Sequence, residues 1–172
     1  MALGAAGVRQ AVQAWFDAPA VQGLNRVYAA MPWWAGGDQW DIGLNGGWGA
    51  IGYVHITDEH ETRIAYGGIP GGIKQVTYQV GLVLLFKYQI PTQLPAGADE
   101  SEYVTYLDAL IDGVKNRLRQ DPTLGTGSKG VVWQAGEGRA DVVIRRDLPR
   151  RKGQAVQSWQ VLEVEVVENV FG

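Results

Sequence analysis

The chain has no cysteine among its 172 residues, so it can form neither disulfide bonds nor a thiolate metal site. Histidine is almost as scarce, with only His55 and His60. No stretch approaches the roughly 18 consecutive apolar residues of a membrane-spanning helix, and the N-terminus lacks the basic start and apolar core of a signal peptide. We therefore expect no membrane span and no secretory leader. A cysteine-free chain fits either a reducing cytosol or a protein that is indifferent to redox conditions.

Strong charge is absent as well. The formal net charge is -3, so composition gives no general case for nucleic-acid binding. Hydrophobic residues make up 46% of the chain, which is enough for a real core. These values predict a single folded domain spanning residues 1–172.

The most regular pattern in the chain covers residues 73–89, where apolar residues alternate with others at a period of two. One series of alternate positions is almost entirely apolar: Val76, Tyr78, Val80, Leu82, Leu84, Phe86 and Tyr88. This period is that of a β-strand, whose side chains point alternately to opposite faces. Such a strand would reach more than about 50 Å, against a usual length of about 5–6 residues. The middle of the strand, residues 80–86, is apolar on both faces and therefore has to be covered on both sides. Because two helices can hardly cover both faces, we expect a neighbouring subunit to complete the packing.

Two helices are predicted. Residues 7–18 carry Val8, Val12, Trp15 and Phe16 on one helical face. Residues 99–120 form the clearer helix, with Asp99 as N-cap and Glu102 completing a capping box. Its expected buried stripe consists of Tyr103, Tyr106, Leu107, Leu110, Ile111, Val114 and Leu118.

The remaining segments are predicted as strands, turns and loops. A hairpin is expected from strands at 50–57 and 62–66, joined by a polar turn at 58–61. A glycine-rich arm at 67–72 follows it. Other strands are expected at 23–28, 130–134, 140–145 and 155–167, and residues 31–49 and 148–154 are expected to be loops. The order predicts an α+β domain: an antiparallel or mixed sheet with a long central strand, packed by two main helices.

Signatures of catalysis are weak. The two histidines lie beside Asp58, Glu59 and Glu61, but their spacing matches no established zinc pattern, and a polar turn is the favoured interpretation. Residues 125–130 satisfy G-x-G-x-x-G, yet a helix precedes them and a strand follows, the reverse of the dinucleotide-binding order. The three serines lie outside any G-x-S-x-G motif. Glu163 and Glu165 resemble a glycosidase pair only in residue type, and their alternation predicts a solvated sheet face. We expect no enzyme activity, no cofactor and no metal.

Two surface features remain. The Trp/Gly-rich loop at 31–49 contains four tryptophans, which either fill a core or subunit interface or form a platform for sugars or peptides: Trp33, Trp34, Trp40 and Trp48. The one basic cluster either touches DNA phosphates, is solvated, or meets acidic groups on a neighbour: Arg145, Arg146, Arg150, Arg151 and Lys152.

Five segments together carry a resemblance: Val8-Arg9-Gln10-Ala11-Val12, Thr62 to Gly68, Gly72 to Val80, Tyr106 to Gly125, and Trp159 to Glu168. In this order the chain resembles tail terminator and head-to-tail connector proteins of long-tailed, siphovirus-type bacteriophages, especially of actinobacterial hosts. The resemblance covers most of the chain and rests on residue types, not on catalytic motifs. The segment at 31–49 is the part that fits the family pattern least.

The resemblance implies a structural virion protein at the tail-neck junction, assembled in the host cytoplasm. A tail terminator forms a homo-oligomeric, usually hexameric, ring on the tail tube protein, ends tube polymerisation and docks to the head-neck connector or stopper. DNA passes through its lumen without specific binding, and no membrane is involved. The alternatives are another neck component, a minor tail protein or, more remotely, a carbohydrate-binding module that uses the Trp-rich loop.

Two sets of residues follow as candidates for this role. Those expected at a subunit interface are Trp33, Trp34, Trp40, Trp48, Gly67, Gly68, Val83 and Leu85. Those expected to face the lumen are Glu163 and Glu165, whose negative charge would repel DNA phosphate.

Overall fold

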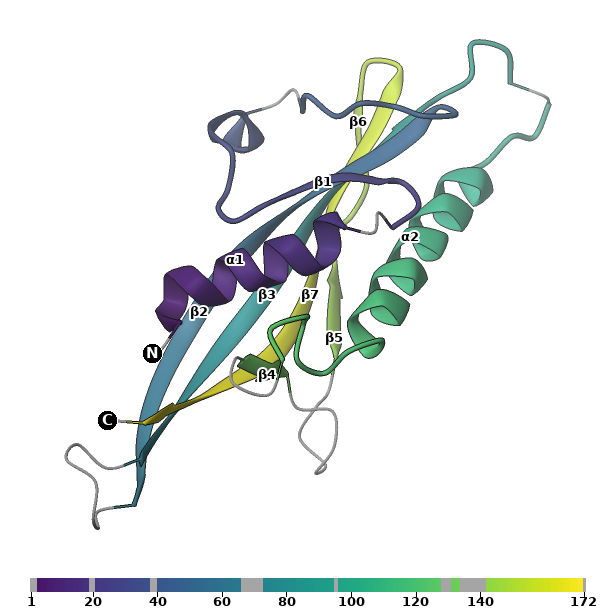
Figure 1. Cartoon of the computed structure of the whole chain (residues 1–172). Coiled ribbons are helices and arrows are strands. Elements are labelled where there is room, and N and C mark those ends of the chain that lie inside the picture. The colour runs from purple at the N-terminus through teal and green to yellow at the C-terminus, as the bar shows by residue number, and fades with distance from the viewer. Residues whose placement is uncertain are drawn as a thin grey trace.

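The structure is a computed structural model, and its described residues form one extended sheet with two α-helices and a short 3-10 helix (Figure 1). It describes residues 3–18, 21–37, 40–65, 73–94, 96–127, 131–133 and 142–171. The helices are α1 (Gly4–Asp17), the short 3-10 helix η1 (Trp33–Gly36) and α2 (Ser101–Arg119). The strands are β1 (Leu24–Tyr28), β2 (Trp48–Ala65), β3 (Ile73–Gln89), β4 (Val131–Trp133), β5 (Val143–Arg146), β6 (Arg150–Lys152) and β7 (Ala155–Phe171).

In the described residues the strands form one seven-stranded sheet of order β1-β2-β3-β7-β4, with β5 and β6 also paired to β7. β1 runs parallel to β2, and the other pairs are antiparallel. The predicted α+β class with a mixed sheet is confirmed. The long strand is also confirmed, because β3 spans the predicted residues and lies at the centre of the strand order. β3 pairs with β7 along its whole length, from Ile73 opposite Phe171 to Gln89 opposite Ala155, without a register shift.

The predicted hairpin at 50–66 is wrong. β2 is one continuous strand through Asp58, Glu59, His60 and Glu61, and it pairs with β3. The register shifts at Thr57, where a β-bulge inserts one residue instead of a turn. Residues 57–64 are exposed on both faces of the sheet, so they lack the apolar alternation of a half-buried strand. Their polarity, which indicated a turn, reflects this exposure.

The predicted basic loop at 148–154 is also wrong in part. Arg150–Lys152 forms β6, which turns back at Gly153 and Gln154 into β7, with Lys152 opposite Ala155. The strands expected near 130–134 and 140–145 appear as β4 and β5, and residues 130, 134, 140 and 141 of these predictions lie outside the described residues. The expected arm at 67–72 lies wholly outside them.

Both helices pack on one face of the sheet (Figure 1). This face carries the even-numbered residues of β3, and the main core lies between it and the helices. The predicted stripe of α2 is buried except for Tyr106, which is half-buried. The predicted capping box is wrong, because the N-cap of α2 is Glu100 and it makes no side-chain cap hydrogen bond. The Asp99 carboxylate accepts a hydrogen bond from the Ser101 N–H at 2.9 Å, and Glu102 accepts one from the Tyr88 hydroxyl at 2.6 Å.

The opposite face carries the odd-numbered residues of β3. It is called here the helix-free face because neither α-helix packs on it, although the 3-10 helix η1 does. A second, smaller core covers part of it, built on Ile42, Ile51, Val83 and Leu85, with Trp34 and Trp40 packed against it. The expectation that only a neighbouring subunit can cover the apolar middle of β3 is therefore wrong. The Trp-rich segment of the same chain covers it, because apolar side chains without a regular period can still fold over a sheet.

Candidate interaction surfaces

The four tryptophans of the Trp-rich segment occupy three different environments. Trp48, at the start of β2, is 7% exposed and belongs to the main core, where its ring stacks on Tyr106 at a centroid distance of 4.9 Å. Trp34 and Trp40 are half-buried against the second core. Trp33 is 98% exposed. Of these four candidate interface residues, only Trp33 is almost fully exposed.

The other candidate interface residues are less open. Val83 and Leu85 are 7% and 3% exposed because the second core of their own chain covers them. Gly67 and Gly68 lie outside the described residues. Among the candidates, the surface available to a partner is therefore centred on Trp33, near Met31, which is 50% exposed.

Glu163 and Glu165 lie on the helix-free face, as their alternation along β7 predicts. Glu163 forms an ion pair with Arg145 of β5 at 2.8 Å, and Glu165 accepts a hydrogen bond from the Gln79 amide at 3.2 Å. Both carboxylates are half-buried. The Arg145 partner offsets part of the negative charge that the sequence alone assigned to this face.

A shallow hollow of about 450 Å³ lies beside this ion pair, lined by Thr57, Asp58, Gln79, Val80, Arg145 and Glu163. It brings the bulge of β2 together with the two charged residues of β5 and β7. Its lining is mainly polar and charged, which suits contact with a polar surface better than the binding of an apolar ligand.

The outer half of β2 is an open sheet edge. β1 pairs with β2 only from Ala50 to Tyr53, and beyond Tyr53 the described residues include no strand on that side. Three carboxylates project here, and we call them the acidic edge: Asp58, Glu59 and Glu61. Glu61 pairs with Lys74 of β3 at 2.8 Å. Unpaired backbone groups on such an edge can accept another strand.

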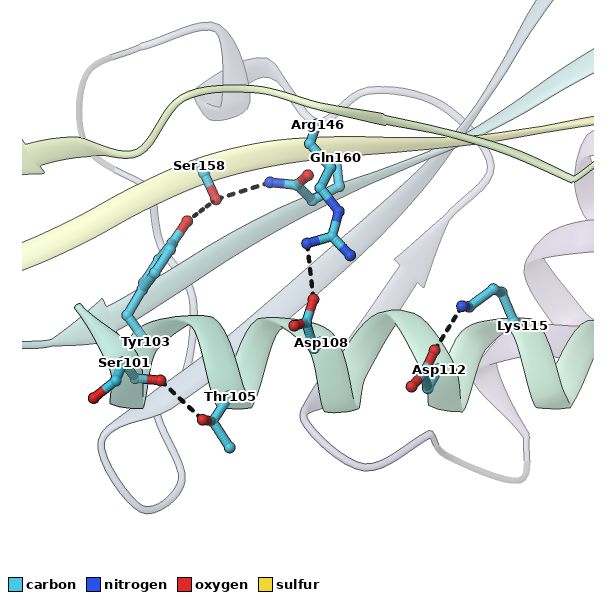
Figure 2. A network of polar contacts seen from close by, with 9 residues as sticks. All are labelled: Ser101, Tyr103, Thr105, Asp108, Asp112, Lys115, Arg146, Ser158 and Gln160. Carbon is cyan, nitrogen blue, oxygen red and sulfur yellow. Dashed lines mark hydrogen bonds and ion pairs between the residues drawn. The ribbon is translucent and has the colours of Figure 1, made fainter.

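The opposite side of the sheet carries the predicted basic cluster. Its five exposed cations lie on β5 and β6, and we call them the basic edge: Arg145, Arg146, Arg150, Arg151 and Lys152. Besides the Arg145 pair, Arg146 meets Asp108 of α2 at 2.8 Å and Arg150 lies 3.6 Å from Asp147 (Figure 2 shows the Arg146 pair). These exposed pairs stabilise the fold little and leave the edge basic.

A buried polar network holds α2 on the sheet. The Tyr103 hydroxyl is hydrogen-bonded to Ser158 of β7, and the Gln160 amide donates to the same serine at 3.0 Å (Figure 2). Burial, the hydrogen bond to Glu102 and its negative charge raise the pKa of Tyr88 to about 12. This region has a structural role, because the Tyr103 and Ser158 hydroxyls and the Gln160 amide nitrogen bond one another within the fold.

Sequence reasoning missed two buried charges at the ends of α1. At its N-terminus, Glu168 of β7 accepts hydrogen bonds from the Leu3 and Gly4 N–H groups. At its C-terminus, Arg117 of α2 donates to the Trp15 and Ala18 carbonyls at 3.0 and 2.8 Å. Each charge has the sign that the helix dipole favours at that end. Nothing in the sequence distinguishes Glu168 or Arg117 from the neighbouring charged residues, so their contacts with the ends of α1 could not be predicted from it.

The histidines do not form a joint site. His55 and His60 are exposed on β2 and lie opposite Gly81 and Thr77 of β3. Within the described ranges, no three histidine or carboxylate side chains gather as metal ligands would. At the start of the G-x-G-x-x-G segment, the Asp121 carboxylate accepts hydrogen bonds from the N–H groups of Thr123, before the motif, and of Gly125, its first glycine, as in a tight turn after a helix. No helix in the part of the chain that the structure describes is both long and apolar enough to span a membrane.

Comparison with known proteins adds no family to this picture: no protein-family model matches the chain, and no curated protein is similar to it.

Proposed function

We propose that this protein is a structural component of a bacteriophage virion, a tail terminator whose copies form a ring on the tail tube. In this proposal the ring ends tube polymerisation and docks to the head-neck connector. The protein acts without catalysis, at the tail-neck junction. The proposal starts from the resemblance of the sequence to this group, and the shape of the fold supports it.

The observation that carries the proposal is the outer half of β2. Residues 57–64 are exposed on both faces, and the strand has no neighbour on its outer side among the described residues. A single domain rarely extends a strand of this length without cover, because unpaired edges invite association. An assembly of identical copies gives such an edge a partner.

The distribution of helices supports a ring wall. α1 and α2 cover one face, while the distal part of the other face is polar and carries Glu163 and Glu165. In a ring wall, one face of the sheet is covered by the outer layer of helices, and the other face lines the lumen and has to be compatible with water and passing DNA. With Glu163 paired to Arg145, the proposed lumen would present mixed charge with an acidic contribution from Glu165.

The direct test is tube capping. The tail tube protein encoded in the same genome is polymerised with and without this protein, and tube lengths are measured by electron microscopy. We expect added protein to stop elongation and to appear as a ring at one tube end. Continued growth at a molar excess of the protein would contradict the proposal. A ring at the end of tubes that keep growing would favour another neck or minor tail role.

One observation favours a second candidate, a carbohydrate-binding module. Trp33 is 98% exposed, and a free indole face is the usual platform for a sugar ring. A glycan screen with the parent protein and Trp33→Ala tests this. Binding lost in Trp33→Ala but kept in Trp159→Ala would support it, since Trp159 is also an exposed tryptophan but lies on β7 instead of η1.

A further inference from the structure

The two lateral edges of the sheet carry opposite charge. Along the outer side of β2, the carboxylates of Asp58, Glu59 and Glu61 outnumber the one arginine of residues 57–64, Arg63. The five cations of the basic edge lie on β5 and β6 at the other side. An edge of one sign repels a copy of itself and attracts an edge of the other sign. The charges therefore disfavour β2-to-β2 pairing and favour head-to-tail contact.

Strand direction fits the same contact. β2 is antiparallel to β3, β3 to β7, and β7 to β5, so β2 and β5 run in opposite directions. A neighbour generated by rotation about a ring axis to which the strands are tilted, as in closed sheets, keeps these directions approximately. Its β5 then meets β2 in antiparallel orientation, which allows regular backbone hydrogen bonds.

A stagger between neighbouring copies would bring opposite charges together. Asp58 lies level with Gln79 and hence with Glu165 of β7, while Arg145 lies level with Val161. To place Asp58 opposite the neighbour's Arg145, the neighbouring copy has to be displaced along the strand direction by four residues of β7, from the level of residue 161 to that of residue 165. This stagger is roughly 13 Å at about 3.3 Å per residue. Closed sheets require such a stagger.

We propose, building on the ring function above, that successive copies pair edge to edge, with the outer half of β2 of one copy antiparallel to β5 of the next. Asp58 and Arg145 form the central cross-copy charge pair. In the same register, His60 faces Val143, because His60 lies level with Val167 and Val143 with Glu163. The cations of β6 lie further along the same edge and steer the acidic edge toward it. Contacts of this heterologous kind close into a ring when the rotation permits.

The chain has no cysteine, so introduced thiols report this contact without background. His60→Cys combined with Val143→Cys is treated with a short bismaleimide linker, and each single variant serves as a control. We expect the double variant to give a ladder of dimers, trimers and larger species, and the single variants to remain monomers. Dimers from His60→Cys alone would show β2-to-β2 pairing and overturn the proposal. No cross-linking in the double variant would overturn it too.

Reversing the charges of the two edges gives a second test of the same contact. The acidic-edge variant is Asp58→Lys with Glu59→Lys, and the basic-edge variant is Arg145→Glu with Arg146→Glu. All four substituted residues are exposed, and the folding of each variant is checked by circular dichroism. Built into the two-cysteine background, each variant alone should lose the ladder at least tenfold, and an equimolar mixture should restore it, since every contact then joins unlike edges. A mixture that stays monomeric would count against the pairing.

The outcomes separate this interface from the proposed function. If the two-cysteine protein caps tubes but gives no ladder, the terminator function is supported and the proposed interface is refuted. If it gives the ladder but leaves tube growth unchanged, the interface is supported and the terminator function is refuted.

Discussion

The Arg117 guanidinium of α2 stacks on the Trp15 ring of α1, with the Arg117 Cζ 3.5 Å from the ring centroid. The contact is reciprocal, because the Trp15 indole N–H donates to the Arg117 carbonyl at 3.1 Å while the guanidinium donates to the Trp15 carbonyl. Arg117 is 8% exposed. It joins the two helices that cover the main core.

Arg117→Ala is expected to destabilise the protein by about 2–4 kcal/mol, because the Trp15 and Ala18 carbonyls lose a charged donor in a partly buried setting. Denaturant unfolding of the parent and the variant measures the change. Arg119→Ala is the matched control, since Arg119 is exposed in the same helical turn. Equal effects of the two substitutions would argue against the role of Arg117.

Gly23→Ala is expected to cost more than Gly46→Ala. Both glycines have positive φ, +81° and +68°, so alanine is strained at either position. A Cβ at Gly23 would lie 1.9 Å from the buried Trp48 ring, while one at Gly46 meets no atom within 4 Å. Overpacking should add at least about 1–3 kcal/mol for Gly23→Ala. Thermal unfolding of both variants checks the difference, and a smaller loss for Gly23→Ala would contradict the packing.

Trp48→Ala and Trp33→Ala should separate stability from interaction. Trp48 fills the main core, so its truncation should cost about 3–5 kcal/mol. Trp33→Ala should change the free energy of unfolding by no more than about 0.5 kcal/mol, because the side chain is exposed. If Trp33 docks the ring to a partner, the second variant should fold normally and cap fewer tubes. Denaturant unfolding and tube-length measurement together test both statements.

Stability should fall at alkaline pH. Burial, with the charges of Glu168 and Glu59, raises the pKa of Tyr78 to about 12, and the pKa of Tyr88 is also about 12, against an ordinary 10.0. The folded state thus favours the neutral phenols. Their contribution is complete below about pH 10 and is lost as the pH rises toward about 12. Unfolding midpoints across this window should fall, less steeply in Tyr88→Phe than in the parent. An unchanged slope in Tyr88→Phe would contradict the assignment for that residue.

The sequence predicted elements whose side chains meet one core at a regular period. β3 and the buried stripe of α2 were predicted almost residue by residue, because alternate or helical positions such as Val80, Leu82 and Leu110 pack on one surface. The outer half of β2 was missed for the opposite reason. Its two faces are exposed, so Asp58 to Glu61 carry no periodic signal.

The candidate surfaces were predicted only in part. The polar setting of Glu163 and Glu165 follows from alternation, but the ion pair of Glu163 with Arg145 depends on β5 returning beside β7. Sequence does not distinguish exposed Trp33 from half-buried Trp34, because the short η1 helix turns adjacent side chains in different directions. These features arise from tertiary contacts that local patterns do not encode.

The unbroken pairing of β3 with β7 also has a mechanical consequence. When a pulling force acts along the strands, the hydrogen bonds of a long antiparallel pair are loaded side by side and share the tension, instead of opening one after another like a zipper. Seventeen residues of β3 are paired in this way. A wall built from such strands would be stiffest along the strand direction and would yield first at its short lateral contacts.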